Sequence, residues 1–314
     1  KSKILNLFLL WNFYLIINSF FSINPLLSFE QTLFNFRFGF FAISFVIVFN
    51  KKDNFLNTLL KSCLLVYFIV SFDALIQFFL GYNLLGFKMG IDDGIRISGI
   101  FRDIHILGFF IAYFTPVIIS LIFFERKFLY NTTFINFLIF FSFFIILIST
   151  ERMSLIFYIF NMLLISFFVS KLKYTRYLFL IFILIGTLFV INNDNYKYRF
   201  FEQPIKQSSQ YINFFKTSKN IFLDNFLFGV GVKNYREVCK LDQYATYIKI
   251  DNKDRNACST HPHNFYLQLL SESGIFGTLP VFFLMMYLLT KIINLFKSTF
   301  FLSNNNQKDY YTVI

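Results

Sequence analysis

The segment with the clearest chemical potential runs from Cys258 to Asn264 (CSTHPHN) and directly precedes a long apolar run. Asn264 suits the start of a helix, because its side-chain oxygen accepts from the free backbone N–H groups there. A helix cap does not explain two nearby histidines. An imidazole titrates near neutral pH, so we predict that His263 is a general base at the membrane edge, with His261 in support.

Glu151 and Arg152 form a second candidate site, in a very short turn between two apolar runs. Ionisable groups at membrane depth usually face a protein interior or a wet cavity. We therefore expect the guanidinium of Arg152 to bind a buried anion. Arg37 fits either such a role or simple contact with lipid headgroups through its long side chain.

Other polar residues cluster near the same ends of the apolar runs, namely Asp73, Gln77, Arg96, Arg102 and His105. Arg96 and Arg102 lie in a true loop, where a single arginine is usually a solvated charge. Asp92 and Asp93 adjoin in a glycine-flanked turn, and such acids are more often turn residues than metal ligands. No other group has ligand spacing, so we predict neither a metal nor another cofactor.

The cysteines indicate a covalent constraint on the same region. Cys63 lies inside an apolar run, whereas Cys239 and Cys258 share one hydrophilic segment. In an oxidising compartment these two are expected to pair, which would stabilise the segment by about 3 kcal/mol. The alternative is two free thiols on a mobile loop.

Apolar runs must position all of these residues. The 314-residue chain is 56% hydrophobic and 23% aromatic, with a mean hydropathy of +0.59. A span needs ~20 apolar residues, and the sequence predicts an all-α integral membrane protein, a polytopic helical bundle of about eight spans. The expected spans are 4–23, 33–50, 62–80, 104–124, 134–149, 154–170, 177–192 and 264–296. The last is interrupted at Gly274, Gly277 and Pro280.

We divide the chain into a seven-span membrane region, a long external loop, and a final part with the histidine motif, the last span and the tail: 1–192, 193–262 and 263–314. Within the loop, apolar residues recur at helical spacing over 209–223, which predicts a helix lying in the membrane interface. The glycine pair in FGVG lacks the strand and helix of a phosphate-binding loop, so we interpret it as a tight turn.

The distribution of charge sets the expected orientation. The net charge of +12 is spread between apolar runs, which favours membrane anchoring over nucleic-acid binding. Lysine and arginine concentrate near the N-terminus, in the tail and in 51–61, 125–133 and 171–176, so both termini are predicted to be cytoplasmic. Arg152, His263 and the long loop then face the outside.

Four segments together resemble the O-antigen ligase and O-antigen polymerase superfamily. His263-Asn264 followed by Gly274-Ile-Phe-Gly277 is similar to the family's hallmark. ALIQFFLGYNLLGF with RISGIFRDIHILG, STERMSL, and NIFLDNFLFGVGVKNYREVC resemble its third-loop region, its short arginine-bearing turn and its long external loop. The resemblance covers roughly residues 30–280. Members of the family usually have more spans, which indicates that the chain is a fragment.

The resemblance implies a C-type glycosyltransferase fold and metal-independent transfer from an undecaprenyl-pyrophosphate-linked glycan at the outer face of a bacterial inner membrane. It makes His263 the base for the acceptor hydroxyl, with Asn264, His261 and Glu151 in support. The arginines expected to hold the pyrophosphate are Arg152, Arg96, Arg236 and Arg37.

The resemblance favours a polymerase that joins oligosaccharide repeats of a surface polysaccharide, because of the two-cysteine loop that ends in CSTHPHN. One alternative is a ligase that transfers the finished glycan to lipid A–core. The other is a transporter that binds a polysaccharide or lipid-linked glycan through the same arginines without chemistry.

Overall fold

The structure, a computed structural model, describes residues 3–51, 54–90, 95–102, 104–124, 132–169, 172–206, 208–250, 253–256 and 258–301. It confirms an all-α polytopic membrane protein. Six helices in these ranges are long and apolar enough to cross a membrane, and two shorter apolar helices accompany them, Ile4–Phe20 and Arg152–Phe168. Each predicted span coincides with one of these eight segments. The spans agree because long apolar runs leave the backbone no partner but itself.

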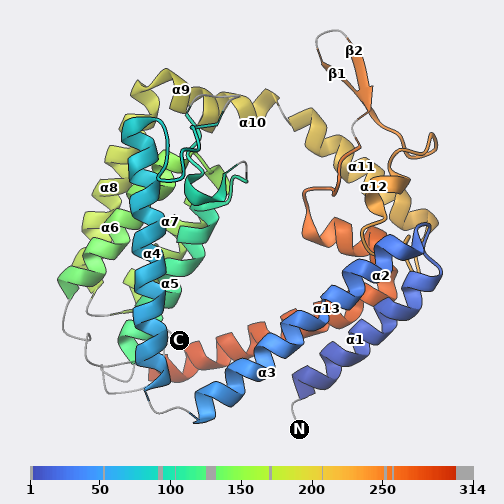
Figure 1. Cartoon of the computed structure of the whole chain (residues 1–314), viewed down its shortest axis with the longest axis horizontal. Helices are drawn as coiled ribbons and strands as arrows, with labels where there is room; N and C mark the ends of the chain where they lie inside the picture. Colours follow the sequence, from blue (N-terminus) through green and yellow to red (C-terminus); the bar gives the residue numbers. More distant parts are fainter. Residues whose placement is uncertain are drawn as a thin grey trace. The chain divides into compact units, whose positions relative to one another are not determined.

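The helices, in chain order, are α1 Lys3–Phe20, α2 Pro25–Phe34, α3 Phe36–Lys51, α4 Phe55–Leu80, η1 Gly99–Phe101, α5 Leu107–Phe124, α6 Thr132–Ser149, α7 Arg152–Phe168, α8 Lys173–Asn192, α9 Asp194–Lys197, η3 Tyr198–Glu202, α10 Gln203–Lys206, α11 Ser208–Asp224, α12 Tyr235–Val238 and α13 Phe265–Phe301 (Figure 1). They form two compact units. The terminal unit comprises Lys1–Lys51 and Pro204–Ile292, and the central unit comprises Lys52–Gln203 and Ile293–Ile314.

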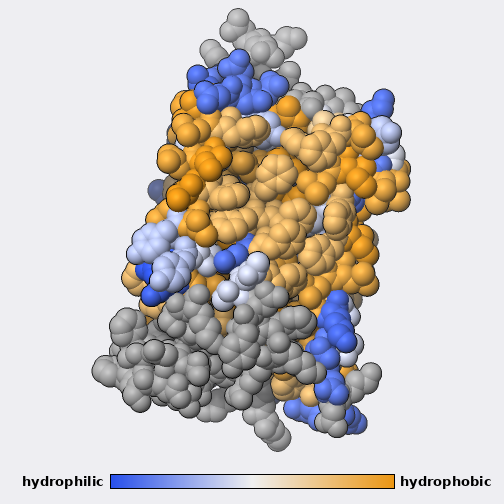
Figure 2. Space-filling view, turned by 90° about the vertical axis from the view of Figure 1, so that its left-hand side faces the viewer, coloured by the Kyte–Doolittle hydropathy of each residue, from blue (hydrophilic) through white to orange (hydrophobic). Residues whose placement is uncertain are grey.

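The central unit is a helical bundle around a buried chain of hydroxyl groups. Tyr67 Oη lies 2.6 Å from Ser142 Oγ, which lies 2.8 Å from Thr115 Oγ1. Such pairs join helices where the surroundings offer no water. Apolar side chains pack around them, including Ile111, Ile118, Leu138 and Ile146. Figure 2 shows an outer face covered by apolar side chains, with hydrophilic residues toward its upper and lower ends, as a lipid-facing surface requires.

Three buried polar side chains fold the connection after α4 back onto that helix. Asp73 Oδ1 accepts from the Leu84 N–H at 3.0 Å, and Gln77 Oε1 accepts from the Gly99 N–H at 2.7 Å. Asn83 Nδ2 donates to the Gly99 carbonyl at 2.9 Å. Asp73 and Gln77 therefore use their polar atoms to hold this loop.

In the terminal unit, two segments cross at backbone distance where α13 breaks. Gly274 has φ 62° and ψ −168° inside α13, which confirms the predicted interruption of the last span, while Pro280 stays within the helix. The N–H groups of Val230 and Gly231 donate to the carbonyls of Ser271 and Glu272 at 3.0 and 2.8 Å. The glycine pair of FGVG thus packs against a helix break, in addition to turning the chain.

Helix α1 completes this crossing from a single face. Trp11 Nε1 donates to the Gly277 carbonyl at 2.8 Å, and Tyr14 Oη donates to the Ser273 carbonyl at 2.7 Å. Asn18 Nδ2 donates to the Phe228 carbonyl at 2.7 Å. Positions 11, 14 and 18 share a helix face. These side chains donate hydrogen bonds to backbone carbonyls. In hydrocarbon those carbonyls would have no water as a donor.

Helix α11 matches the helix predicted over 209–223. It packs Phe214, Thr217, Ser218 and Ile221 inward, while Ile212 and Phe215 stay about half exposed on the other face. The segment that follows contains a β-hairpin, Tyr247–Ile250 paired antiparallel with Lys253–Asn256. No strand was predicted here, because two four-residue strands in a mostly polar segment are too short to leave a clear hydrophobic pattern.

Gly274→Ala should unfold the terminal unit, whereas Gly86→Ala should be mild. Both glycines have positive φ, at 62° and 80°. A Cβ at Gly86 meets nothing within 4 Å, so only the left-handed backbone costs energy, about 1–2 kcal/mol. A Cβ at Gly274 would stand 2.6 Å from the Gly229 backbone nitrogen. Thermal unfolding of detergent-solubilised protein, followed by size exclusion, compares the variants, and equal midpoints would contradict the crossing.

Candidate functional site

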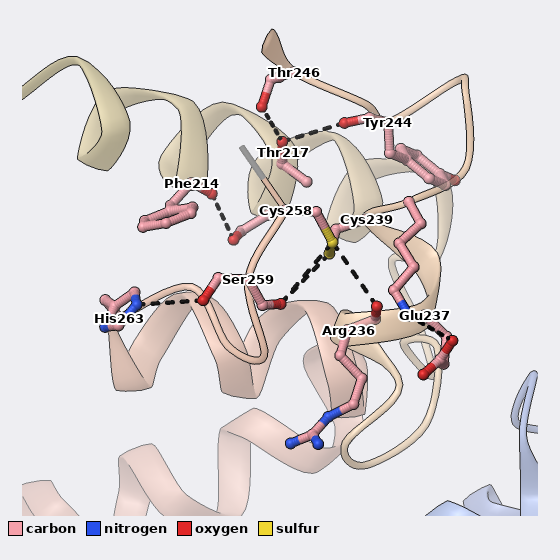
Figure 3. The surroundings of a disulfide bond; sticks show 12 residues. Phe214, Thr217, Arg236, Glu237, Cys239, Tyr244, Thr246, Cys258, Ser259 and His263 are labelled. Atoms are coloured by element: carbon pink, nitrogen blue, oxygen red, sulfur yellow. Dashed lines mark hydrogen bonds and ion pairs between the residues drawn. A yellow bond between two sulfur atoms is a disulfide. The ribbon is translucent and has the colours of Figure 1, made fainter. Parts of the chain in front are cut away.

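His263 stands immediately before α13, and its side chain lies beside that of Ser259 (Figure 3). Asn264 Oδ1 accepts from the Leu267 N–H at 3.1 Å, so this residue caps the helix as its type predicted. The His263 backbone has φ 53°, a conformation that sets its side chain apart from the helix direction. Its ring lies 4.2 Å from the His261 ring and 5.1 Å from the Phe214 ring, between centroids.

These surroundings tune His263 toward a base. Burial, and secondarily the neighbouring His261, lower the pKa of His263 below its usual value. The ring is therefore neutral at pH 7, and one of its nitrogens can accept a proton. It still reaches solvent, and Nε2 lies 3.4 Å from Ser259 Oγ. A neutral, accessible imidazole at a fixed position is what general-base chemistry requires.

A disulfide ties the segment that precedes His263 to α12. Cys239 and Cys258 are bonded, with Cα atoms 5.3 Å apart (Figure 3). Cys239 is fully buried in a small apolar cluster with Ile221, Val230, Tyr235, Val238 and Tyr244. The bridge limits how far the five-residue segment to His263 can move from this cluster.

Arg236 lies on the same short helix as the disulfide but points away from it (Figure 3). Its charge acts on Glu272, a carboxylate of α13 that is only 5% exposed. Arg236 Nε is buried and has no hydrogen-bond partner among the described residues. Arg236 therefore acts electrostatically on Glu272 inside the terminal unit, an interaction that was not predicted from the sequence.

The central unit holds the second predicted group, centred on Glu151. Its Oε1 accepts from the Gly108 N–H at 2.9 Å and its Oε2 from the Phe109 N–H at 3.2 Å. Glu151 therefore caps the start of α5, although it precedes α7 in sequence. A Cβ on Gly108 would stand 2.7 Å from Ser149 Oγ, so glycine is needed for the turn to approach α5 this closely.

The charges of two arginines act on the Glu151 carboxyl group. Burial raises the pKa of Glu151 to about 7. The two backbone N–H groups and the charges of Arg96 and Arg199 lower this pKa, but by less than burial raises it. Arg152 follows directly as the first residue of α7 and is half-buried. Glu151, Arg152 and Arg96 thus belong to the same unit, and the charges of Arg96 and Arg199 reach Glu151.

Arg199 was not predicted as a site residue from the sequence. In the structure it is buried, with 7% of its surface exposed. It lies in the π-helical turn η3 and donates through Nη1 to Gln203 Oε1. The surrounding NNDNYKYRFFEQ reads as a solvated polar stretch. The one available signal was the Arg–Gln spacing of four residues, which places both side chains on one helix face.

The remaining predicted residues fall as follows. The guanidinium of Arg37 stacks on the Phe38 ring of its own helix at 4.9 Å, a contact that neither of its two expected roles included. Asp92 and Asp93 lie outside the described residues. His261, His263, Asn264, Arg236 and the disulfide belong to the terminal unit, and Arg96, Glu151 and Arg152 to the central unit. Within the described ranges, no three His, Cys, Asp or Glu side chains gather at a metal-binding distance.

Comparison with known proteins gave one match. Residues 137–282 match the family model described as O-antigen ligase. The matched stretch contains Arg152 and Arg199 of the central unit. It also contains Arg236, His263 and Glu272 of the terminal unit. No curated protein and no solved structure matched the chain.

Thiol labelling should show whether Cys239 and Cys258 are bonded, by the number of cysteines that label before and after reduction. The chain has three cysteines, of which Cys63 is free and buried. Denatured, unreduced protein should therefore label at Cys63 alone, and reduced protein at Cys63, Cys239 and Cys258. A Cys63→Ser variant gives the matched control, with no label before reduction. Mass spectrometry locates the label, and labelling of Cys239 and Cys258 without a reductant would rule the bridge out.

Proposed function

We propose, on the premise that the chain belongs to the O-antigen ligase and O-antigen polymerase superfamily, that it is a membrane glycosyltransferase of the polymerase type. It would join oligosaccharide repeats carried on undecaprenyl pyrophosphate, at the outer face of a bacterial inner membrane. The observation that carries the proposal is the accessible, neutral imidazole of His263, capped and disulfide-tied at the start of α13.

The reaction assigns one task to each group. An acceptor hydroxyl attacks C1 of the donor sugar, and the bond from C1 to the pyrophosphate oxygen breaks. The hydroxyl proton passes to the imidazole of His263, and the electron pair of the broken bond leaves with the polyprenyl pyrophosphate. A positioned base typically contributes 10²–10⁴-fold to such a step.

The departing pyrophosphate gains negative charge, which guanidinium groups stabilise as it develops. Arg152 and Arg96 are proposed for this role, joined by Arg199. Glu151 supports them: it keeps the turn seated on α5, and its pKa near 7 limits how much arginine charge it neutralises. Arg236 is proposed as a further contact from the terminal unit, and Arg37 as a weaker one because it stacks on Phe38. No step calls for a metal or another cofactor.

The orientation that follows from the lysine and arginine distribution places both ends of the chain in the cytoplasm and 193–262 outside. His263, Glu151 and Arg152 each lie at a helix start on the side assigned to the outside. Nucleotide-activated sugars belong to the cytoplasm, so a lipid-linked donor suits this location. The bilayer itself would carry that donor to the enzyme.

A ligase is the second candidate, favoured by the description of the matched family model. The chemistry at the donor is the same, and only the acceptor differs. Purified protein offered a lipid-linked repeat and lipid A–core separately distinguishes the two. Elongation of the lipid-linked repeat supports the polymerase, and product on lipid A–core alone supports the ligase.

His263→Ala should lower transfer by roughly 10²–10⁴-fold, because the acceptor hydroxyl loses its base. The variant should still accumulate and form the Cys239–Cys258 bridge. Tyr266→Ala is the matched control, since Tyr266 is 55% exposed in the first turn of the same helix. Product length on a gel reports the result. Normal products from His263→Ala would refute the base and favour a transporter, which needs none.

Arg152→Lys should fail nearly as badly as Arg152→Ala, with a loss of about tenfold to a hundredfold. A lysine keeps the charge but cannot reproduce the two-pronged guanidinium contact. Arg176→Lys is the control, because Arg176 lies on α8 and stacks on the Phe167 ring at 5.0 Å. Initial rates over a range of donor concentrations decide the matter. Full activity in Arg152→Lys would leave only a need for charge.

A further inference from the structure

The terminal unit contains a small polar cavity that the reaction described above does not use. Its volume is about 150 Å3, and it lies between α1, α2 and α13. The residues that line it include the aromatic Trp11 and Phe265 and the polar Gln31, Asn35, Gln268 and Glu272. At about 30 Å3 for each water, it holds on the order of five waters.

Glu272 is the residue that indicates an occupant. It is 5% exposed, and its Oε2 accepts from Gln268 Nε2 at 3.2 Å. Its Oε1 makes no hydrogen bond of good geometry among the described residues, although the backbone N–H groups of Lys233 and Tyr235 and the charge of Arg236 act on the same carboxyl group. A buried acceptor without a donor is costly, so an occupant that donates a hydrogen bond would stabilise this arrangement.

The lining selects among the possible occupants. A divalent cation takes six or more oxygen ligands, but Glu272 is the one carboxylate that lines the cavity. The amides of Gln31, Asn35 and Gln268 both donate and accept, as neighbouring hydroxyl groups do. Trp11 and Phe265 add apolar faces. Hydroxyl groups around a compact ring with apolar C–H edges satisfy all of these features, and the volume suits one ring rather than a chain.

The cavity also lies close to the proposed base along the chain. Phe265, Gln268 and Glu272 share one face of α13, at i, i+3 and i+7. With a rise of 1.5 Å per residue, they extend roughly 10 Å from the helix start. His263 stands at that start. A ring held in the cavity is therefore placed within about two helical turns of the imidazole.

We infer that this cavity is a sugar subsite: it binds one pyranose ring of the glycan, with Glu272 accepting a hydrogen bond from a ring hydroxyl. The inference rests on the proposed function for the identity of the ligand as a glycan. It adds a binding site to that function and gives Glu272 a role in recognition.

The protein supplies its own reporter, because Trp11 is the single tryptophan of the chain and lines the cavity. Detergent-purified protein is titrated with a panel of methyl hexopyranosides and N-acetylhexosaminides, with glycerol as the acyclic control. At least one glycoside should change the Trp11 fluorescence saturably, and glycerol should not. Absence of a saturable change with every glycoside would overturn the inference.

Variants assign the site. Glu272→Gln keeps the side-chain size and should weaken binding roughly tenfold or more, as loss of a hydrogen bond to a charged group predicts. Gln31→Met, similar in size without the amide, should also weaken binding and decides the matter if Glu272→Gln does not accumulate. Glu30→Gln, on the exposed face of α2, should bind as the wild type does. Equal affinity in Glu272→Gln and Gln31→Met would refute the site.

The subsite and the proposed function fail separately. His263→Ala should lose transfer and keep the fluorescence titration, because the base does not line the cavity. Glycoside binding without transfer to any acceptor would refute the polymerase and ligase and leave the subsite. Transfer that depends on His263, without glycoside binding, would refute the subsite alone.

Discussion

The terminal unit depends on the direct approach of two backbones, at Gly229 and Gly274. No side chain separates them, and a Cβ on Gly229 would stand within 2.6 Å of the Glu272 carbonyl oxygen. The break in α13 frees backbone groups, which cost several kcal/mol each if left unpaired in hydrocarbon. Segment 226–231 and the polar face of α1 satisfy the carbonyls around the break. The start of α13, and with it His263, takes its place relative to this crossing.

The central unit is organised by one carboxylate in a comparable way. Glu151 reaches another helix and receives two N–H groups at the start of α5, where the helix dipole also favours negative charge. Burial nevertheless dominates and raises its pKa to about 7. Near neutral pH its negative charge is therefore incomplete. The same residue thus shapes the turn before Arg152 and sets the electrostatic field around it.

Much of the architecture follows from local sequence. Apolar runs fix the spans because lipid forces backbone pairing within each segment, and Asn264 and Gly274 act through their own backbone geometry. The rest depends on partners distant in the chain. Glu151 caps α5 only because Gly108 lets the turn approach that helix. The FGVG segment binds the backbone of residues 271–272. The burial of Arg199 depends on packing that its polar surroundings in the sequence do not indicate. Arg236 could be found only by resemblance, because its partner Glu272 lies on another helix.

The topology also dictates an order of assembly. The central unit comes almost entirely from one continuous stretch, 52–203, and can pack as soon as that stretch is inserted. Helix α1 has to wait, since Trp11 and Gly277 are 266 positions apart and Asn18 and Phe228 are 210 apart. During synthesis its polar face therefore stays without its final partners until Phe228 and α13 have been made. The contacts of the terminal unit are therefore completed only after α13 has been made, when residues 52–203 have already been inserted.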